Sequence, residues 1–345
     1  MSESLFPWQQ RNWTQLQQLR ERLPHAILFH GAAGIGKRVF AERFAQALLC
    51  QTPLPDGQPC ETCLSCGWFT QYGHPDFRRV RPEALEDEPG EEGEEAEAVE
   101  KKASKTKAPS KDIKIDQIRA LADFMNISTH RAGMRVITLY PAEALNTAAA
   151  NALLKTLEEP PPNTMFLLVS NNLDRLLPTI LSRCRKFALD MPAADEALAW
   201  LETQEIKEPA AWLAEQGGAP LAALEQAQSG DRETMDDFLR HLANPGVDGA
   251  LKTADRLQKT PVPDLVAWLQ RWQYDLFSHK LCGNIRYYPR YSKELARLAA
   301  RSDVAALMRG LKATGDRRRI AEHPLSPKLF IEDMLLEYAT LFSGN

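Results

Sequence analysis

One stretch near the start decides the fold of this chain: His30-Gly31-Ala32-Ala33-Gly34-Ile35-Gly36-Lys37-Arg38. It follows the phosphate-binding pattern G-x-x-x-x-G-K-[ST], with Gly31, Gly36 and Lys37 in place. Gly34 adds a third glycine inside the loop. In such a loop the backbone N–H groups and the lysine hold the phosphates, and a final hydroxyl ligates Mg²⁺. Arg38 stands at that final position, and a guanidinium has no lone pair to offer a metal ion.

The segments on either side of the glycine loop have the required context. Residues 26–29 form a short apolar run that predicts a buried strand, and residues 39–49 predict a helix with Phe40, Phe44 and Leu48 on one face. Strand, glycine loop and helix together indicate a phosphate-binding-loop fold. The alternative interpretation is a glycine-rich turn that binds no ligand.

The second half of a nucleotide site is largely missing. Residues 135–140 predict another core strand, and in phosphate-loop ATPases acidic residues near this point hold Mg²⁺ and polarise water. Here the strand ends in Tyr140-Pro141, and Glu143 comes three residues late. Loss of metal-handling groups at both Arg38 and Tyr140 indicates abandoned hydrolysis, because two independent losses are hard to explain as one unusual substitution.

The following segments alternate between helix and strand. Residues 146–159 predict a helix that is closed by three prolines, and residues 165–170 predict a third apolar strand. Residues 176–185 precede a short strand at 187–189. Such alternation indicates an α/β fold with a parallel sheet that is covered on both faces.

Four of the six cysteines lie close together in the sequence, at Cys50, Cys60, Cys63 and Cys66. Four thiolates match the closed tetrahedral site of a structural Zn²⁺. His74 is the alternative fourth ligand in place of Cys50. An iron–sulfur cluster is a second alternative, but a small knuckle of chain suits zinc better. The solitary Cys184 and Cys282 are expected to be partly buried thiols.

The net charge of −4 is unevenly distributed over the 345 residues. Ten carboxylates lie between Glu83 and Glu100 and five lysines between Lys101 and Lys111, so the rest of the chain is near +1. We expect 82–111 to be a disordered acidic insertion, since it has too few large apolar residues for a core. An acidic interaction segment is the alternative. The sequence shows no membrane span and no signal peptide, which indicates a cytoplasmic protein.

The second part of the chain is predicted to be helical. Residues 194–230 have a small helical pattern, and further helices are expected at 233–242, 249–258, 263–281, 292–315 and 329–342. In the third of these helices, Trp268, Trp272, Leu276 and Phe277 form an apolar face that is typical of a core. The run 317–319 of three arginines predicts a solvated basic face, with contact to DNA as the alternative.

Two further motifs carry a family resemblance. The run 151–161 (NALLKTLEEPP) and Ser182-Arg183-Cys184 resemble signatures of the AAA+ clamp-loader subunits of replicative DNA polymerases. The cysteines at this place in the chain resemble the bacterial DNA polymerase III branch. The resemblance covers residues 24 to about 230, and the acidic insertion departs from the family pattern.

The resemblance implies a mechanism. Clamp loaders are five-subunit rings that use ATP to open a sliding clamp and place it on primed DNA, with ATP at subunit interfaces. Arg183 falls on the position of the arginine finger, which reaches the developing phosphate charge in a neighbouring subunit. A structural salt bridge is the alternative role for Arg183. Leu221 stands where family ATPases usually carry an arginine that contacts nucleotide.

The resemblance therefore implies a non-hydrolysing subunit with structural Zn²⁺, and with ATP bound by the partner subunits. Its partners would be the gamma/tau ATPase and delta subunits of a hetero-pentamer, and through them the clamp and primer-template DNA. The alternatives are an active ATPase motor with an atypical loop and a zinc-dependent nucleic-acid-binding module, which the near-neutral body disfavours. The expected domains are an AAA+ domain at 1–191 with the zinc module at 50–66, a lid at 192–230 and a helical collar at 231–345.

Overall fold

The computed structural model describes residues 4–86, 109–126, 129, 133–229, 232–322 and 326–342. The chain forms two compact units, Met1–Ala193 and Ala194–Asn345. The boundary of the first unit lies close to the predicted end of the AAA+ domain. The further division of the second unit into lid and collar stays a prediction.

A parallel five-stranded sheet organises the first unit, in the order β2-β3-β4-β1-β5. The strands are β1 (Ala26–His30), β2 (Phe77–Val80), β3 (Arg135–Leu139), β4 (Thr164–Ser170) and β5 (Arg185–Ala188). This confirms the predicted α/β class. The last strand begins two residues before the apolar run that predicted it, because an edge strand tolerates the exposed Arg185 and Lys186.

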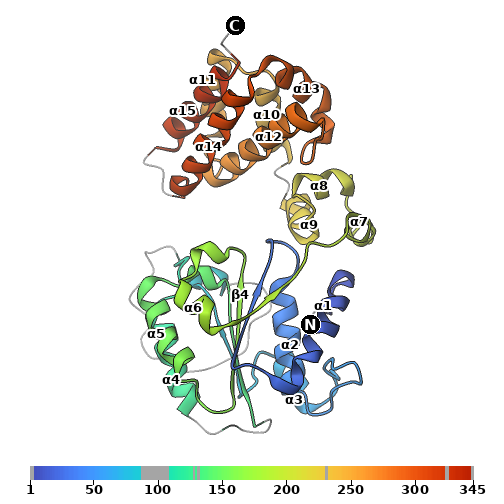
Figure 1. Ribbon diagram of the computed structural model, residues 1–345, viewed down its shortest axis with the longest axis vertical. Coiled ribbons are helices and arrows are strands. Elements are labelled where there is room, and N and C mark those ends of the chain that lie inside the picture. The colour runs from blue at the N-terminus through green and yellow to red at the C-terminus, as the bar shows by residue number, and fades with distance from the viewer. Residues whose placement is uncertain are drawn as a thin grey trace. The chain divides into compact units, whose positions relative to one another are not determined.

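Helices cover both faces of this sheet (Figure 1). They are α1 (Gln10–Gln18), α2 (Lys37–Leu49), α3 (Leu64–Thr70), α4 (Ile115–Asn126), α5 (Thr147–Glu158) and α6 (Pro178–Arg183). Short 3₁₀ turns are η1 (Pro7–Gln9), η2 (Arg20–Arg22), η3 (Glu83–Leu85), η4 (Ala142–Ala144) and η5 (Leu173–Arg175). Figure 1 shows α1 to α3 on one face and α4 to α6 on the other.

The two faces of β1 show why the strand is apolar throughout. Leu28 packs in the cluster beneath α4 and α5, and the next residue, Phe29, points to the other face and makes edge-to-face contacts with Phe40 and Phe44 of α2. Successive strand residues alternate between faces, so a strand covered on both sides needs apolar residues at every position. Four of its five residues are fully buried.

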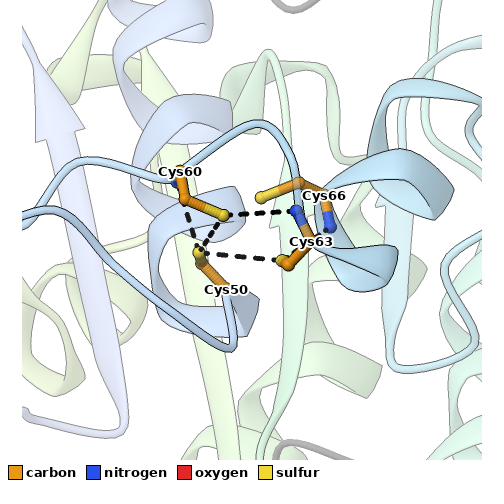
Figure 2. Close-up of side chains that lie close together, drawn as sticks. All are labelled: Cys50, Cys60, Cys63 and Cys66. Atoms are coloured by element: carbon orange, nitrogen blue, oxygen red, sulfur yellow. Dashed lines mark hydrogen bonds between the residues drawn. The ribbon is translucent and has the colours of Figure 1, made fainter.

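The cysteine-rich segment is inserted between α2 and β2. Cys50 is the C-cap of α2, and Cys63 is the N-cap of α3, where its Sγ accepts the backbone N–H of Cys66 (Figure 2).

Residues 87–108, which contain most of the predicted acidic insertion, lie outside the described residues. The two ends of the insertion are described. They are joined by a hydrogen bond from the Ala84 N–H to the Ser110 carbonyl, at 3.0 Å.

The second unit is helical. Its helices are α7 (Ala194–Glu202), α8 (Pro209–Glu215), α9 (Pro220–Ser229), α10 (Arg232–Ala243), α11 (Val247–Leu257), α12 (Val262–Cys282), α13 (Ser292–Arg301), α14 (Val304–Ile320) and α15 (Pro327–Thr340), with η6 at Pro289–Tyr291. One hydrophobic cluster runs from α7 to α15, so residues of the predicted lid and collar share a core.

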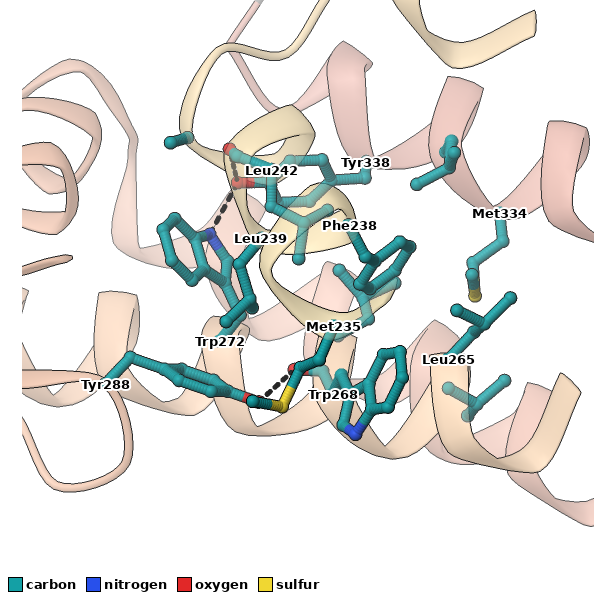
Figure 3. Packing of buried hydrophobic residues seen from close by; sticks show 14 of the residues in the cluster. Met235, Phe238, Leu239, Leu242, Leu265, Trp268, Trp272, Tyr288, Met334 and Tyr338 are labelled. Atoms are coloured by element: carbon teal, nitrogen blue, oxygen red, sulfur yellow. Dashed lines mark hydrogen bonds between the residues drawn. The ribbon is translucent and has the colours of Figure 1, made fainter. Parts of the chain in front are cut away.

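The aromatic face predicted on α12 forms the centre of that core. Trp268, Trp272 and Leu276 are buried, and Phe277 is partly buried and packs against the same cluster. The Trp272 indole donates to the Tyr338 hydroxyl at 2.7 Å, and that hydroxyl donates to the Leu242 carbonyl at 2.8 Å (Figure 3). These bonds satisfy the polar atoms that burial of the two aromatic rings would otherwise leave without a partner.

The single helix predicted at 292–315 is wrong. It is divided into α13 and α14 at Ser302 and Asp303, and α14 continues to Ile320. Both residues of the break favour side-chain to backbone bonds over an uninterrupted helix. The Ser302 hydroxyl donates to the Leu298 carbonyl, and Asp303 caps the next helix.

Candidate functional site

The glycine loop lies between β1 and α2, as predicted, but its lysine is turned back onto the loop. Lys37 Nζ donates to the Ala32 carbonyl, and the side chain is buried. Burial lowers the pKa of Lys37 to about 8, although the nearby Glu143 carboxylate acts in the opposite direction. The Ala32 carbonyl therefore occupies a donor of the ammonium group that a bound phosphate would otherwise use.

Two of the loop glycines are fixed by close neighbours. Gly31 and Gly36 have φ angles of 152° and 85°, a region that L residues rarely adopt. A Cβ on Gly31 would lie 2.3 Å from the Leu189 carbonyl oxygen, and one on Gly36 would lie 2.6 Å from the ring of Phe6. Gly34 also has a positive φ, of 74°. The loop therefore keeps the backbone of a phosphate site.

The two substituted positions of the nucleotide site contact each other. The Arg38 guanidinium carbon lies 5.7 Å from the centre of the Tyr140 ring, within range of a cation–π contact. Arg81 donates to the Tyr140 hydroxyl at 3.4 Å on the same side of the sheet. The place where a metal-binding site would need a hydroxyl and a carboxylate is thus occupied by a cation and an aromatic ring.

Glu143 is the carboxylate that remains near Lys37. It lies in η4, and its Oε1 accepts the Asn171 backbone N–H at 3.0 Å. Its Oε2 has no hydrogen-bond partner among the described residues. The sequence placed this residue three positions late, and the structure shows that it still reaches the neighbourhood of the lysine.

The four cysteines form one compact cluster, with all four sulfurs within 4.8 Å of one another (Figure 2). The Cys50 sulfur lies 3.5 Å from that of Cys60 and 3.9 Å from that of Cys63. Four sulfurs bound to one Zn²⁺ at about 2.3 Å would lie about 3.8 Å apart. The cluster could therefore bind a single metal ion such as zinc.

Polar groups around Cys60 favour its thiolate form, whereas burial raises the pKa of Cys50. The Cys60 sulfur accepts the backbone N–H of Cys63 at 3.3 Å and the Thr52 hydroxyl at 3.2 Å. Hydrogen bonds from the Thr52 and Thr62 hydroxyls lower the pKa of Cys60 to about 5, whereas burial raises the pKa of Cys66. Thiolate is the form that a metal ion requires.

His74, the alternative ligand, is used elsewhere. Its Nδ1 accepts the Asp76 backbone N–H at 3.1 Å, and its Nε2 lies 2.8 Å from the Ser65 hydroxyl, which donates to the Leu49 carbonyl at 2.6 Å. Both ring nitrogens are thus engaged in a buried chain of hydrogen bonds. These hydrogen bonds link the residues before β2 to the end of α2, and they hold the cysteine-rich segment in place.

Arg183 ends α6 with its side chain about one-third exposed. One terminal nitrogen contacts the Glu158 carboxylate at 2.5 Å, and the other donates to the Thr179 carbonyl at 3.0 Å. The structure thus shows a salt bridge to α5 and leaves part of the guanidinium accessible. Leu221 lies in the first turn of α9 and is half-buried.

Comparisons with known proteins decide the family. A family model described as "DNA polymerase III, delta subunit" matches residues 8–193. DNA polymerase III subunit delta' of Pseudomonas aeruginosa is 37% identical over 80% of this chain and 78% of its own length. The delta' subunit of Haemophilus influenzae is 32% identical over 81% and 79%. The chain belongs to the DNA polymerase III delta-prime family.

Similarity to solved structures is weaker. A DNA polymerase III gamma-subunit-related protein from Thermotoga maritima covers 96% of this chain and 99% of its own, at 18% identity and a TM-score of 0.43. The delta-prime assignment therefore rests on the sequence relatives. No helix within the described ranges is both long and apolar enough to cross a membrane.

Several residues beside the glycine loop of this delta-prime protein were not predicted from the sequence. The Trp8 indole donates to the Ile35 carbonyl at 3.0 Å, and the Gln9 amide donates to the Gly36 carbonyl at 2.9 Å. The N-terminal segment therefore closes one side of the glycine loop. No motif marked it, because contacts across more than 25 residues leave no local pattern.

Two expectations outside the site have clear outcomes. Cys184 is buried, but Cys282 is exposed at the end of α12, so the prediction that it is partly buried is wrong. The second expectation was a solvated basic face at 317–319: Arg318 and Arg319 are exposed, whereas Arg317 is largely covered, and all three have partners. Arg317 pairs with Asp333 and Glu337, Arg318 donates to Gln270, and Arg319 pairs with Asp316.

Proposed function

We propose that this chain is the non-hydrolysing delta-prime subunit of a DNA polymerase III clamp loader. In this proposal it joins gamma/tau and delta subunits in a hetero-pentamer that loads the sliding clamp onto primer-template DNA. ATP is bound by partner subunits, and Arg183 acts as an arginine finger at a neighbour's nucleotide. The chain is not an ATPase by itself.

The contact between Arg38 and Tyr140 carries the non-hydrolysing part of this proposal. Both residues replace groups that would hold Mg²⁺, and their cation–π contact shows that the two substitutions fit each other. Lys37 supports the same conclusion, since its ammonium group donates a hydrogen bond to the Ala32 carbonyl of the loop. A loop with these features has neither the hydroxyl nor the strand-end carboxylate that would hold the metal ion of phosphoryl transfer.

Arg183 supports the second part. Its side chain lies at the end of a helix, is accessible, and has the planar fork that matches phosphate. Interface arginines of this kind raise phosphoryl-transfer rates by about 10³-fold or more. One side chain can therefore determine the rate at a site in another subunit.

The test uses a loader reconstituted with its own partner subunits. Arg183→Ala should slow clamp loading and clamp- and DNA-stimulated ATP hydrolysis, with a partial loss because the other sites keep their own arginines. Arg183→Lys should restore little, because a point charge lacks the fork. Lys37→Ala in this chain is the control and should leave both rates unchanged. An unchanged rate with Arg183→Ala would refute the finger.

The isolated chain separates this proposal from its alternative, an active ATPase motor. We expect no steady ATP hydrolysis by the purified protein. Hydrolysis that Lys37→Ala abolishes would favour the active motor.

We further propose that the four-cysteine cluster binds one structural Zn²⁺. The sulfur spacing and the hydrogen bonds to the sulfurs support it. Metal analysis should find one zinc per chain in the wild type and little in Cys63→Ser, which should also loosen residues 50–77, because structural zinc contributes to folding. Cys282→Ser, outside the cluster, should keep its zinc. A wild type without metal would exclude the site.

A further inference from the structure

Arg183 and Glu158 bring two separate sequence motifs into contact. Glu158 is the last residue of α5, within the run 151–161, and Arg183 is the last residue of α6. Their ion pair joins positions that are 25 residues apart. Among the polar contacts of the Arg183 guanidinium, the carboxylate is the one that comes from another helix.

The hydrogen bonds fix the direction of the guanidinium. One terminal nitrogen donates to Glu158 Oε1 at 2.5 Å. The other donates to the Thr179 carbonyl at 3.0 Å and to the Ser182 hydroxyl at 3.4 Å. A guanidinium has five N–H donors, so these contacts leave donors for a ligand on its accessible side.

The position of Glu158 is electrostatically unfavourable in its own helix. A carboxylate at the C-terminus of a helix meets the negative end of the helix dipole. Glu158 nonetheless stands there, just before Pro160, where the helix can continue no further. The positive guanidinium of Arg183 offsets this cost, and the fixed end of α5 in turn gives the carboxylate a defined place.

A free arginine side chain samples many rotamers, and ordering it opposes any contact that it makes. With Glu158 in place, much of that ordering has occurred before a phosphate arrives. The side chains of the pair remain 32% and 49% exposed, so an approaching subunit can reach them.

We propose that Glu158 is the positioning residue for Arg183. Its carboxylate holds the guanidinium in the orientation from which it contacts the phosphates of the nucleotide bound by the neighbouring subunit. This inference rests on the proposed finger role of Arg183.

The contact itself is tested on the isolated chain. Phenylglyoxal modifies accessible arginines, and mass spectrometry quantifies the modification of Arg183. The rate should rise in Glu158→Ala by up to about fivefold, the upper limit for an exposed ion pair. It should rise less in Glu158→Gln, whose amide oxygen still accepts a hydrogen bond. Equal rates in wild type and Glu158→Ala would overturn the proposal.

The role is tested in the reconstituted loader. Glu158→Ala should slow clamp loading by up to about fivefold, and Glu158→Gln should retain most of the rate. The double variant with Arg183→Ala should be no slower than Arg183→Ala alone, because the carboxylate acts only through the arginine. Glu159→Ala is the matched control. Its exposed carboxylate has no ion pair with any of the described residues, and a loader that carries this variant should load clamps at the wild-type rate.

The outcomes separate this inference from the proposed function. If Arg183→Ala leaves loading unchanged, the finger role fails, and the role of Glu158 fails with it. If Arg183→Ala slows loading but Glu158→Ala does not, only the positioning role is overturned. Faster loading by Glu158→Ala would mean that the carboxylate competes with phosphate, which also overturns it. Thermal unfolding of each variant is measured to check that the fold is retained.

Discussion

His241 is a buried histidine in α10 whose Nε2 has no hydrogen-bond partner among the described residues. Its ring packs against Gly249 of α11, where a Cβ would approach Nδ1 to 3.2 Å. Burial lowers the pKa of His241, the positive charge of Arg256 adds to this, and Asp237 opposes it. The folded chain therefore keeps this imidazole neutral where the unfolded chain would protonate it.

This gives a signed prediction for stability against pH. In the unfolded chain, His241 binds a proton below about pH 6.5. The contribution of His241 to the free energy of unfolding is therefore fully present above that pH, and it is lost as the pH falls towards the lowered pKa of the folded state. Between pH 7.5 and 5, the wild type should therefore lose more of its free energy of unfolding than His241→Leu. Urea unfolding at several pH values measures this. Parallel losses in both proteins would contradict it.

Single residues also explain the state of the nucleotide site. Arg38 and Tyr140 stand where the phosphate-loop pattern would carry metal-handling groups, and their side chains are in contact. Reverting only one of them would leave the other in the site. Restored metal binding would therefore require changes at both positions.

At the scale of elements, the break between α13 and α14 depends on one cap. Asp303 Oδ2 accepts the backbone N–H groups of Ala305 and Ala306, at 3.0 and 3.3 Å. These donors at the first turn of α14 have no partner within the helix. The cap thus explains why α14 begins at Val304.

Asp303→Ala should destabilise α14 by about 1 kcal/mol, the usual cost of losing an N-cap. Hydrogen exchange of the α14 amides, together with urea unfolding, measures the change. Asp316→Ala is the control in the same helix. It removes only an exposed pair with Arg319 and should change stability by less than about 0.5 kcal/mol. Equal effects of the two substitutions would show that the cap contributes nothing.

At the scale of the whole molecule, the acidic insertion enters and leaves the first unit at one point. Ala84 and Ser110 share a backbone hydrogen bond, and Glu83 accepts the Ser110 N–H at 3.1 Å and pairs with Lys114. The insertion can therefore be shortened without separating its ends, provided that Glu83 is kept.

Replacing residues 88–107 with a short Gly-Ser linker should leave the melting temperature and loader assembly nearly unchanged, since closing a shorter loop costs slightly less entropy. Deleting 83–107 is the comparison. The interpretation of 82–111 as a disordered insertion predicts no effect of this deletion, but the contacts of Glu83 and Ala84 correct it, and the melting temperature should fall. A large loss with the shorter deletion would mean that 88–107 contributes to the fold.

Local patterns determined much of this protein. Interactions within a few residues give rise to the glycine loop, the apolar strands and the proline-closed α5. The corresponding sequence patterns predicted the parallel α/β class and most helices. The spacing of the cysteines indicated a metal site because three of the four lie within seven consecutive residues. Asp303, by contrast, interrupted a helical pattern that extended beyond it, and a single cap was too weak a signal to predict the break.

Only the tertiary structure decided which distant groups meet. Three pairs show this, because their members come from different segments of the chain: Arg38 with Tyr140, Glu158 with Arg183 and His74 with Ser65. The order of strands in the sheet and the packing of helices on it bring them together, and neither leaves a periodic trace in the chain. The sequence by itself determined which chemical groups this protein has lost and kept, and the packing of its elements decided which of them act on one another.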